Sequence, residues 1–178
     1  IIEKEVEDEK TIEELIQDYE LIVEDSVEEP QIVDEILWES PCGTSSTKSY
    51  MDYKAITLVT STQYQYIRNN MYISNGLLYE GDYIGVALGS WWGGIGSKWT
   101  IELDTGVVLK VVKIDEKSDA HTYNGCGHIS DGSVIEIVVD SETIPREWLG
   151  SNGYILNGNF NNLDMFRGNI LRVSRERE

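Results

Sequence analysis

Residues 95–106 read IGSKWTIELDTG, and this stretch decides the fold that we expect for the chain. The residues enter a strand after a glycine turn and run along it. They end at Asp104-Thr105-Gly106, where Asp and Gly stand at positions that are usual for a turn. Short runs rich in β-branched and aromatic residues precede and follow this strand, and Gly or Asp closes each of them. The pattern predicts a mainly β domain.

The other predicted strands lie close together in the sequence, which is typical of a small barrel or sandwich and not of alternating βαβ units. A turn at Asn75-Gly76 joins two aromatic-rich segments that contain Tyr64, Tyr66, Tyr72, Leu77 and Tyr79. We expect one or two short helices, the best of them from Ser141 to Leu149, which should be short or start at Pro145 because proline lies inside it. The strand of the opening motif is predicted at 98–103, and the remaining predicted strands are 55–62, 83–88, 107–114, 134–139 and 170–174.

Glycine and charge divide the chain into two parts. Gly43 is the first of 16 glycines, and the other fifteen all lie from Gly76 onward. The net charge is −18, of which residues 1–41 carry −14 through 16 acidic residues and two lysines. We therefore expect an acidic segment over residues 1–48 and a β domain over residues 49–178. Neither part has the clustered Lys and Arg that nucleic acid requires, so we expect no nucleic-acid partner.

The acidic segment contains one amphipathic pattern. Apolar residues recur at helical spacing from Ile12 to Val23, and Thr11 with Glu14 forms a capping box, which predicts a helix there. Such an acidic helix is marginal alone, so it is either a solvated spacer or a docking arm for a protein partner. No stretch is apolar for the eighteen or more residues that a membrane span needs. The two cysteines, Cys42 and Cys126, are compatible with one bridge or with two free thiols.

Three short motifs resemble the 3D (three-aspartate) double-psi β-barrel domain, which is related to the barrel of membrane-bound lytic transglycosylase A. Ile95-Gly96-Ser97-Lys98 stands at the first turn of that family, and Asp104-Thr105-Gly106 stands at its D-T-G-G motif. The resemblance covers residues 83–140. It implies a small six-stranded double-psi barrel of the kind found in Gram-positive cell envelopes and in phages. Trp91-Trp92-Gly93-Gly94 replaces the first aspartate of the family.

The third family motif aligns in two ways. By direct offset, Lys110 falls on the family lysine, and Ile114-Asp115 falls on its I-D. By local pattern, Gly132 to Glu136 matches G-x-x-I-D with Glu in place of Asp. We favour Glu136 slightly, and both alternatives stay open.

The resemblance implies cleavage of peptidoglycan glycan strands. A lytic transglycosylase needs a single carboxyl group of raised pKa, which protonates the leaving oxygen and then acts as a base. The candidate acids are Asp104 with Glu136 or Asp115, supported by Asp119. Flat rings and polar groups that are candidates for binding the sugars are Trp91, Trp92, Trp99, Tyr123, His121 and Lys110.

Each motif also has a purely structural interpretation or a second functional one. Asp104-Thr105-Gly106 is also an ordinary strand-ending turn, and the tryptophans are equally suited to a core. Asp119, His121, Cys126 and His128 have the residue types of a zinc site but no standard spacing, so we expect neither a metal nor another cofactor. Hydrophobic-Asp-Thr-Gly also resembles the aspartic protease signature, although Val107 stands where Ser or Ala is expected.

Two functional hypotheses follow. The first is a peptidoglycan-active, lytic-transglycosylase-like enzyme located in the cell envelope, outside the cell or in a phage virion. The second is a non-catalytic virion or cell-surface module that binds or assembles through the same barrel. Convergence of Asp104, Asp119 and Glu136 in one cleft favours the first hypothesis, and their failure to converge removes its basis.

Overall fold

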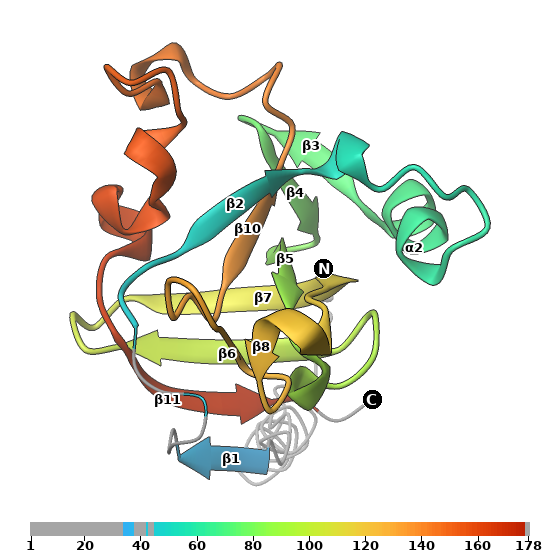
Figure 1. The fold of residues 1–178 in the computed structure, drawn as a ribbon, viewed down its shortest axis with the longest axis vertical. Helices are drawn as coiled ribbons and strands as arrows, with labels where there is room; N and C mark the ends of the chain where they lie inside the picture. Colours follow the sequence, from blue (N-terminus) through green and yellow to red (C-terminus); the bar gives the residue numbers. More distant parts are fainter. Residues whose placement is uncertain (1–33, 38–41, 43–44, 177–178) are drawn as a thin grey trace, which may run out of the picture. The chain divides into compact units, whose positions relative to one another are not determined.

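The computed structural model describes the strand at residues 34–37, residue 42 and residues 45–176, which belong to one compact unit. This part of the chain is mainly β (Figure 1). The strands are β1 (Asp34–Leu37), β2 (Ser49–Asp52), β3 (Tyr72–Ser74), β4 (Leu77–Glu80), β5 (Tyr83–Leu88), β6 (Lys98–Leu103), β7 (Val108–Glu116), β8 (Thr122–Tyr123), β9 (Gly127–His128), β10 (Glu136–Val139) and β11 (Ile170–Arg175).

One α-helix is present among the described residues, α2 (Thr62–Asn70). Ser61 caps it, because the Ser61 Oγ accepts a 3.1 Å hydrogen bond from the Tyr64 N–H. The remaining helical turns are short 3₁₀ segments. They are η1 (Tyr53–Ala55), η2 (Ser90–Trp92), η3 (Asp119–His121), η4 (Arg146–Trp148), η5 (Leu156–Gly158), η6 (Phe160–Asn162) and η7 (Asp164–Phe166).

Nine strands form one sheet with the order β1-β11-β6-β7-β5-β10-β4-β3, and β2 pairs with β10. The β5–β7 and β10–β2 pairs are parallel, and the others are antiparallel. In Figure 1, β2 and β10 run side by side and cross steeply over the layer of β6, β7 and β11. The described strands do not close into a barrel, because the path begins at β1 and ends at β3. β1 joins this sheet although it precedes the expected start of the domain at Ser49.

Two apolar clusters hold the sheet. The larger contains the buried side chains of Trp92, Trp99, Phe160 and Phe166 together with the inward residues of β5, β6, β7 and β10. The smaller lies under α2 and contains Ile67 of that helix. Lys113 and Lys48 are fully buried among these apolar groups, so hydrogen bonds must compensate the burial of each cation.

Most of the predicted strands are confirmed. β5 and β6 have the predicted limits, and β7, β10 and β11 differ from the predicted ranges by one or two residues at their ends. The Asn75-Gly76 turn joins β3 to β4, and both of its residues have positive φ, as a two-residue hairpin of this kind requires.

One predicted strand is wrong. Residues 55–62 form η1 and the approach to α2 instead, because Ser61 caps a helix that carries Tyr64 and Tyr66. The helix predicted within residues 141–149, short or starting at Pro145, is η4, a 3₁₀ segment of three residues directly after Pro145. The predicted helix at residues 12–23 lies outside the described residues. No helix in the described part is long and apolar enough to cross a membrane.

Candidate functional site

Two of the predicted acids lie on either side of one small residue. Ala87 of β5 pairs with Asp115 of β7 on one side and with Glu136 of β10 on the other. Paired residues on neighbouring strands project to the same face of a sheet, so the two carboxylates share a face. Their backbones are two strand spacings apart, roughly 10 Å. The sheet therefore brings together the two acids that the alternative alignments had named separately.

A β-bulge brings Asp115 to this face. The pairing of β5 with β7 shifts by one residue between Val86 and Ala87, so that Asp115, and not Ile114, stands opposite Ala87. A bulge of this kind re-aims a side chain within an otherwise regular strand. Ile114 stays fully buried in the cluster beneath α2.

The surroundings of Asp115 shift the pKa of its carboxyl group upward. Burial raises the pKa of the Asp115 carboxyl, and the charge of Glu116 raises it further. A hydrogen bond from the Glu116 backbone and the charge of Lys113 act in the opposite direction and offset part of this rise. A carboxyl group whose pKa is raised by partial burial is suited to act as a general acid.

Lys117 places a buried positive charge next to Glu136. Its Nζ donates hydrogen bonds to the Ser133 carbonyl oxygen at 3.0 Å and to the Ser133 Oγ at 3.2 Å. Burial lowers the pKa of Lys117, while the charges of Glu136 and Asp131 raise it. The cation therefore fixes the residues that lead into β10 and partly balances two carboxylates. In the sequence, Lys117 is distinguished only by its place between Asp115 and Asp119.

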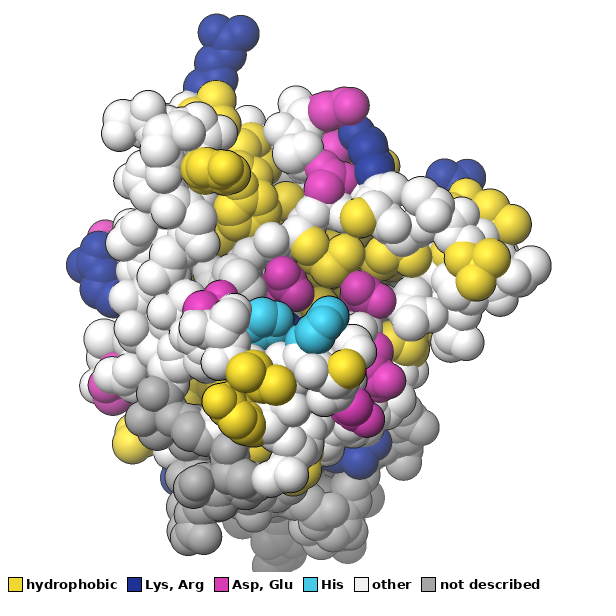
Figure 2. All heavy atoms as spheres, viewed as in Figure 1, with side chains coloured by type: hydrophobic (Ala, Val, Ile, Leu, Met, Phe, Trp, Pro, Cys, Tyr) yellow, Lys and Arg dark blue, Asp and Glu magenta, His cyan; other side chains and the backbone are white. Residues whose placement is uncertain are grey.

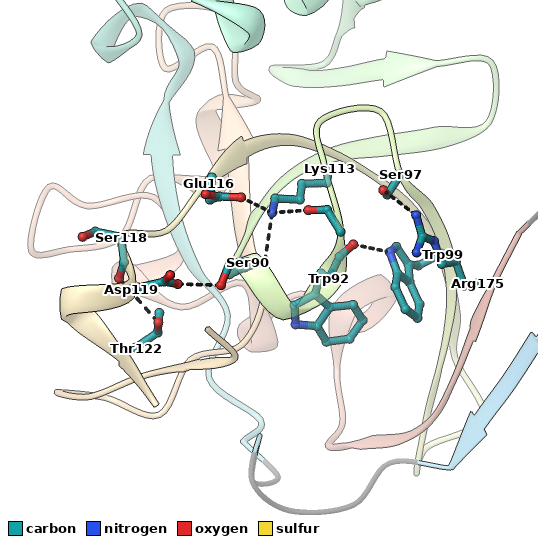
Figure 3. A network of polar contacts seen from close by, with 12 residues as sticks. Ser90, Trp92, Ser97, Trp99, Lys113, Glu116, Ser118, Asp119, Thr122 and Arg175 are labelled. Carbon is teal, nitrogen blue, oxygen red and sulfur yellow. Dashed lines mark hydrogen bonds and ion pairs between the residues drawn. The ribbon is translucent and has the colours of Figure 1, made fainter. Parts of the chain in front are cut away.

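A small hairpin, formed by β8 and β9, lies in the chain between Asp115 and Glu136, the two acids that we call the acid row. Asp119 begins η3, and its Oδ1 accepts a 2.6 Å hydrogen bond from the Ser90 Oγ of η2 (Figure 3). The Trp91 N–H donates to the Gly125 carbonyl at 3.1 Å, which joins η2 to the turn between β8 and β9. Cys126, next to Gly125, forms a disulfide with Cys42, which answers the question that the sequence left open.

Both histidines of the chain lie on this hairpin. The rings of His121 and His128 have centroids 6.2 Å apart, and the His128 Nδ1 lies 3.5 Å from the Asp131 carboxylate. Figure 2 shows the two rings side by side on one face, with acidic side chains beside them. Tyr123 on β8 is 56% exposed. The hairpin thus offers imidazole, carboxylate and aromatic groups to solvent.

Lys113 holds the loop that carries Ser90. Its Nζ donates to the carbonyl oxygens of Gly89 at 2.9 Å and Gly93 at 2.6 Å, and it pairs with Glu116 at 2.7 Å (Figure 3). Gly89 also packs directly against the Gly125 backbone, leaving no room for a Cβ atom. The loop between β5 and β6 is therefore fixed from the sheet side and from the hairpin side.

Asp104 does not lie with the other acids. It stands in the turn between β6 and β7, at the opposite end of β7 from Asp115, and strand geometry separates the two ends by roughly 25 Å. Its carboxylate accepts hydrogen bonds from the Asn169 backbone at 2.9 Å and the Asn169 Nδ2 at 2.7 Å. These two bonds hold the pKa of Asp104 below its usual value.

The predicted sugar-binding residues also divide. Trp92 and Trp99 are 0% and 2% exposed, and the Trp99 Nε1 donates to the Trp92 carbonyl, so both belong to the core. Trp91 is 39% exposed and stacks on Trp99 with ring centroids 5.9 Å apart. Lys110 lies five residues before Asp115 on β7 and pairs with Asp82 at 2.7 Å. Trp91 lies on η2, His121 on η3 and Tyr123 on β8, and the Trp91–Gly125 and Ser90–Asp119 hydrogen bonds join these segments.

Two hollows on the described surface lie away from the acid row. One of about 380 Å³ is lined by Tyr66 and residues 95–98 with Arg175 and Glu176. Another of about 380 Å³ lies between η1 and α2. Neither contains a residue of the acid row, so the candidate site rests on its carboxylates and hairpin and not on the volume of a cavity. Within the described residues, no group of three or more His, Cys, Asp or Glu side chains is arranged to hold a metal ion.

Comparison with known proteins identifies no relative. No family model, no curated protein and no solved structure matches the chain.

Proposed function

We propose that the β domain cleaves the glycan strands of peptidoglycan, with Asp115 as the general acid. The observation that carries the proposal is the shared register of Asp115 and Glu136 about Ala87, combined with the raised pKa of the Asp115 carboxyl. The resemblance to the three-aspartate double-psi barrels supports the substrate class. Its two alternative alignments name these same two acids.

The chemistry assigned to this pair is that of a lytic transglycosylase. Protonated Asp115 gives its proton to the glycosidic oxygen as the bond to the leaving sugar breaks. The 6-hydroxyl of the remaining sugar then attacks its own anomeric carbon, and the Asp115 carboxylate accepts the hydroxyl proton. Glu136 lies across Ala87 and supplies negative charge opposite the developing oxocarbenium ion.

The rim of the site is suited to a sugar chain. Trp91 and Tyr123 expose ring faces of the kind that stack on pyranose rings, and Asp119 is held in place by Ser90. We assign these three residues to binding and give Asp104 no part in glycan cleavage, because it lies at the opposite end of β7 from Asp115. The double-psi barrel topology and the docking role of the acidic segment remain part of the proposal.

The proposed location is the cell envelope, the extracellular space or a phage virion. The disulfide between Cys42 and Cys126 supports a compartment outside the reducing cytosol. Peptidoglycan occurs in that setting and is the partner that the proposal requires.

The test is digestion of purified peptidoglycan sacculi by the full chain, with anhydromuropeptides detected by mass spectrometry. The wild type is expected to release them, and Asp115→Asn is expected to slow release at least ~100-fold. Asp164→Asn is the matched control, because that carboxylate is exposed and pairs only with Arg167 in the described contacts. Release by Asp115→Asn at the wild-type rate, together with loss of release in Asp104→Asn, would transfer the role to Asp104.

A binding module is the second candidate function. The exposed rings of Trp91 and Tyr123 favour it, because they suit carbohydrate recognition without any acid. Co-sedimentation of the chain with sacculi, without release of any soluble fragment, would support binding and overturn cleavage.

A further inference from the structure

A second chemically unusual cluster surrounds Gly168, at the other end of the domain from Asp115. Lys48 lies just before β2 and is fully buried, and its Nζ donates to the Gly168 carbonyl at 2.7 Å. The Gly168 N–H donates to the Asn161 Oδ1 at 2.8 Å. The Asp104 Oδ1 lies so close to Gly168 that a Cβ atom there would be 2.7 Å from it. The side chains of Lys48, Asn161 and Asp104 thus all lie close to Gly168.

The lysine and the asparagine approach each other directly. The Lys48 Nζ lies 3.5 Å from the Asn161 Oδ1. Backbone bonds fix this approach on both sides, since the Lys48 N–H donates to the Asn159 Oδ1 at 3.0 Å and the Phe160 N–H donates to the Lys48 carbonyl at 2.9 Å. In Figure 1 the orange-to-red segment that contains Asn161 lies beside the chain that leads into β2.

We propose that Lys48 and Asn161 become joined by an intramolecular isopeptide bond between the Lys48 Nζ and the Asn161 Cγ. The arrangement contains each part that such a bond requires: a buried amine, a carboxamide within reach, a donor on the carboxamide oxygen and a carboxylate nearby. The inference does not depend on glycan cleavage, because it concerns a different end of the domain.

The surroundings of Lys48 increase the share of its amine that is neutral and able to attack a carbonyl carbon. Burial lowers the pKa of Lys48 to about 8, although the negative charge of Asp104 opposes this shift. A larger share of the amine is therefore neutral near physiological pH than for an exposed lysine. Only a neutral amine has the lone pair that attacks a carbonyl carbon.

The reaction balances without any external reagent. The Lys48 Nζ forms a bond to the Asn161 Cγ, and the carbonyl electrons move onto Oδ1, where the Gly168 N–H stabilises the oxyanion. The Cγ–Nδ2 bond then breaks as the oxyanion collapses. Asp104 is the carboxylate in electrostatic contact with Lys48, and it carries the proton from Nζ to the departing Nδ2. Ammonia leaves, so the chain becomes lighter by about 17 Da.

The bond would fasten a segment that lies outside the main sheet. Residues 145–168 contain the 3₁₀ turns η4 to η7 and one isolated β-bridge between Leu149 and Ile155. Cross-linking Asn161 to the residue before β2 ties this segment covalently to the sheet. It would also close a loop of chain 113 residues long, as a disulfide does.

The test is mass spectrometry of the full chain after reduction and alkylation of the cysteines. The expected intact mass is about 17 Da below the mass calculated for the sequence with both cysteines alkylated, and trypsin should yield one branched peptide in which Lys48 is joined to Asn161. Fragmentation of that peptide is required, because an Asn-Gly succinimide such as one at Asn157-Gly158 produces the same loss. A linear tryptic peptide that ends at Lys48, with no branched partner, would overturn the proposal.

Three variants sharpen the result. Lys48→Arg keeps the positive charge but cannot form the bond, so its mass should equal its own sequence mass. Lys110→Arg is the matched control, because that exposed lysine pairs with Asp82, and it should keep the loss. Asp104→Asn should form the bond at least ten times more slowly at equal pH. A loss of about 18 Da that joins Lys48 to Asp104 would contradict the assignment of Asn161 as the electrophile.

Discussion

Asp115 and Glu136 stand opposite the same alanine, one on a strand parallel to β5 and the other on a strand antiparallel to it. Ala87 is too small to separate the two carboxylates, and burial is the main cause of the raised pKa of the Asp115 carboxyl. The row thus places a carboxyl group of raised pKa near a second carboxylate. The raised pKa of the Asp115 carboxyl predicts an effect on stability as well as on activity.

Asp115→Asn is expected to stabilise the protein at neutral pH. The folded state raises the pKa of this carboxyl above the unfolded value, so it binds more protons than the unfolded chain between the two pKa values. The free energy of unfolding therefore falls as pH rises through this window, and the penalty is fully present above the folded pKa. A neutral amide removes the penalty.

Thermal unfolding at several pH values checks this prediction. The melting temperature of Asp115→Asn should exceed that of the wild type at pH 7, and the difference should vanish below the unfolded pKa. Asp82→Asn is the control of opposite sign, because its pairing with Lys110 lowers the pKa of the Asp82 carboxyl. A lower melting temperature for Asp115→Asn at pH 7 would show that its carboxylate is paired in the folded state.

Gly89→Ala is expected to destabilise the protein by at least about 2 kcal/mol, because its Cβ atom would overlap the Gly125 carbonyl. Backbone atoms lie on both sides of this contact, so no side-chain rotation relieves it. Gly94→Ala is the matched control in the same loop: nothing lies within 4 Å of the added Cβ, and its effect should stay within about 0.5 kcal/mol. Urea unfolding of both variants measures the difference, and equal midpoints would contradict the close packing of loop and hairpin.

The sequence predicted the local part of this fold and missed the non-local part. β5 and β6 were recovered because runs of apolar and β-branched residues ending at Gly or Asp are local signals. The strand predicted at residues 55–62 is absent because their β-branched residues precede a helix that Ser61 caps. β-propensity describes a fit to a half-buried surface, and it cannot detect a helix cap a few residues further along.

The candidate site shows the same division. Asp115 and Glu136 were named as rival matches to one motif, and only the pairing of each with β5 reveals that they are neighbours. Register between strands that are distant in sequence has no local signal. Asp104 was named from a turn motif, and the structure shows the turn serving a contact with Asn169. Lys117 was overlooked because its burial depends on Ser133, which lies beyond the hairpin.

Removal of the disulfide between Cys42 and Cys126 is expected to destabilise the fold by about 2–5 kcal/mol, because the bond links residues 84 positions apart. The effect should be largest at the β8–β9 hairpin, where Cys126 lies between Gly125 and Gly127. Hydrogen exchange should quicken at the Cys126 and His128 amides, which bond to Tyr123 and Ser133. A Cys42→Ser, Cys126→Ser double variant should no longer respond to reductant. If reductant lowers its melting temperature as much as that of the wild type, the bond is not the source of the effect.

Trp91→Ala and Trp92→Ala are expected to separate binding from stability. Trp92 is fully buried at the centre of the larger cluster, so its removal should cost about 3–5 kcal/mol of unfolding free energy. Trp91 is 39% exposed, and its removal forfeits ring contacts with Trp92 and Trp99, at centroid distances of 5.1 Å and 5.9 Å, about 1–3 kcal/mol in all. If Trp91 stacks on sugar rings, Trp91→Ala should weaken co-sedimentation with sacculi about tenfold while the protein stays folded at 25 °C.

Tyr72→Ala is the control. It removes an exposed ring that stacks on Tyr79, outside the proposed site, and should leave sedimentation unchanged. Equal loss of binding in Trp91→Ala and Tyr72→Ala would mean that sacculi are held by general surface adhesion and not by the rim of the acid row.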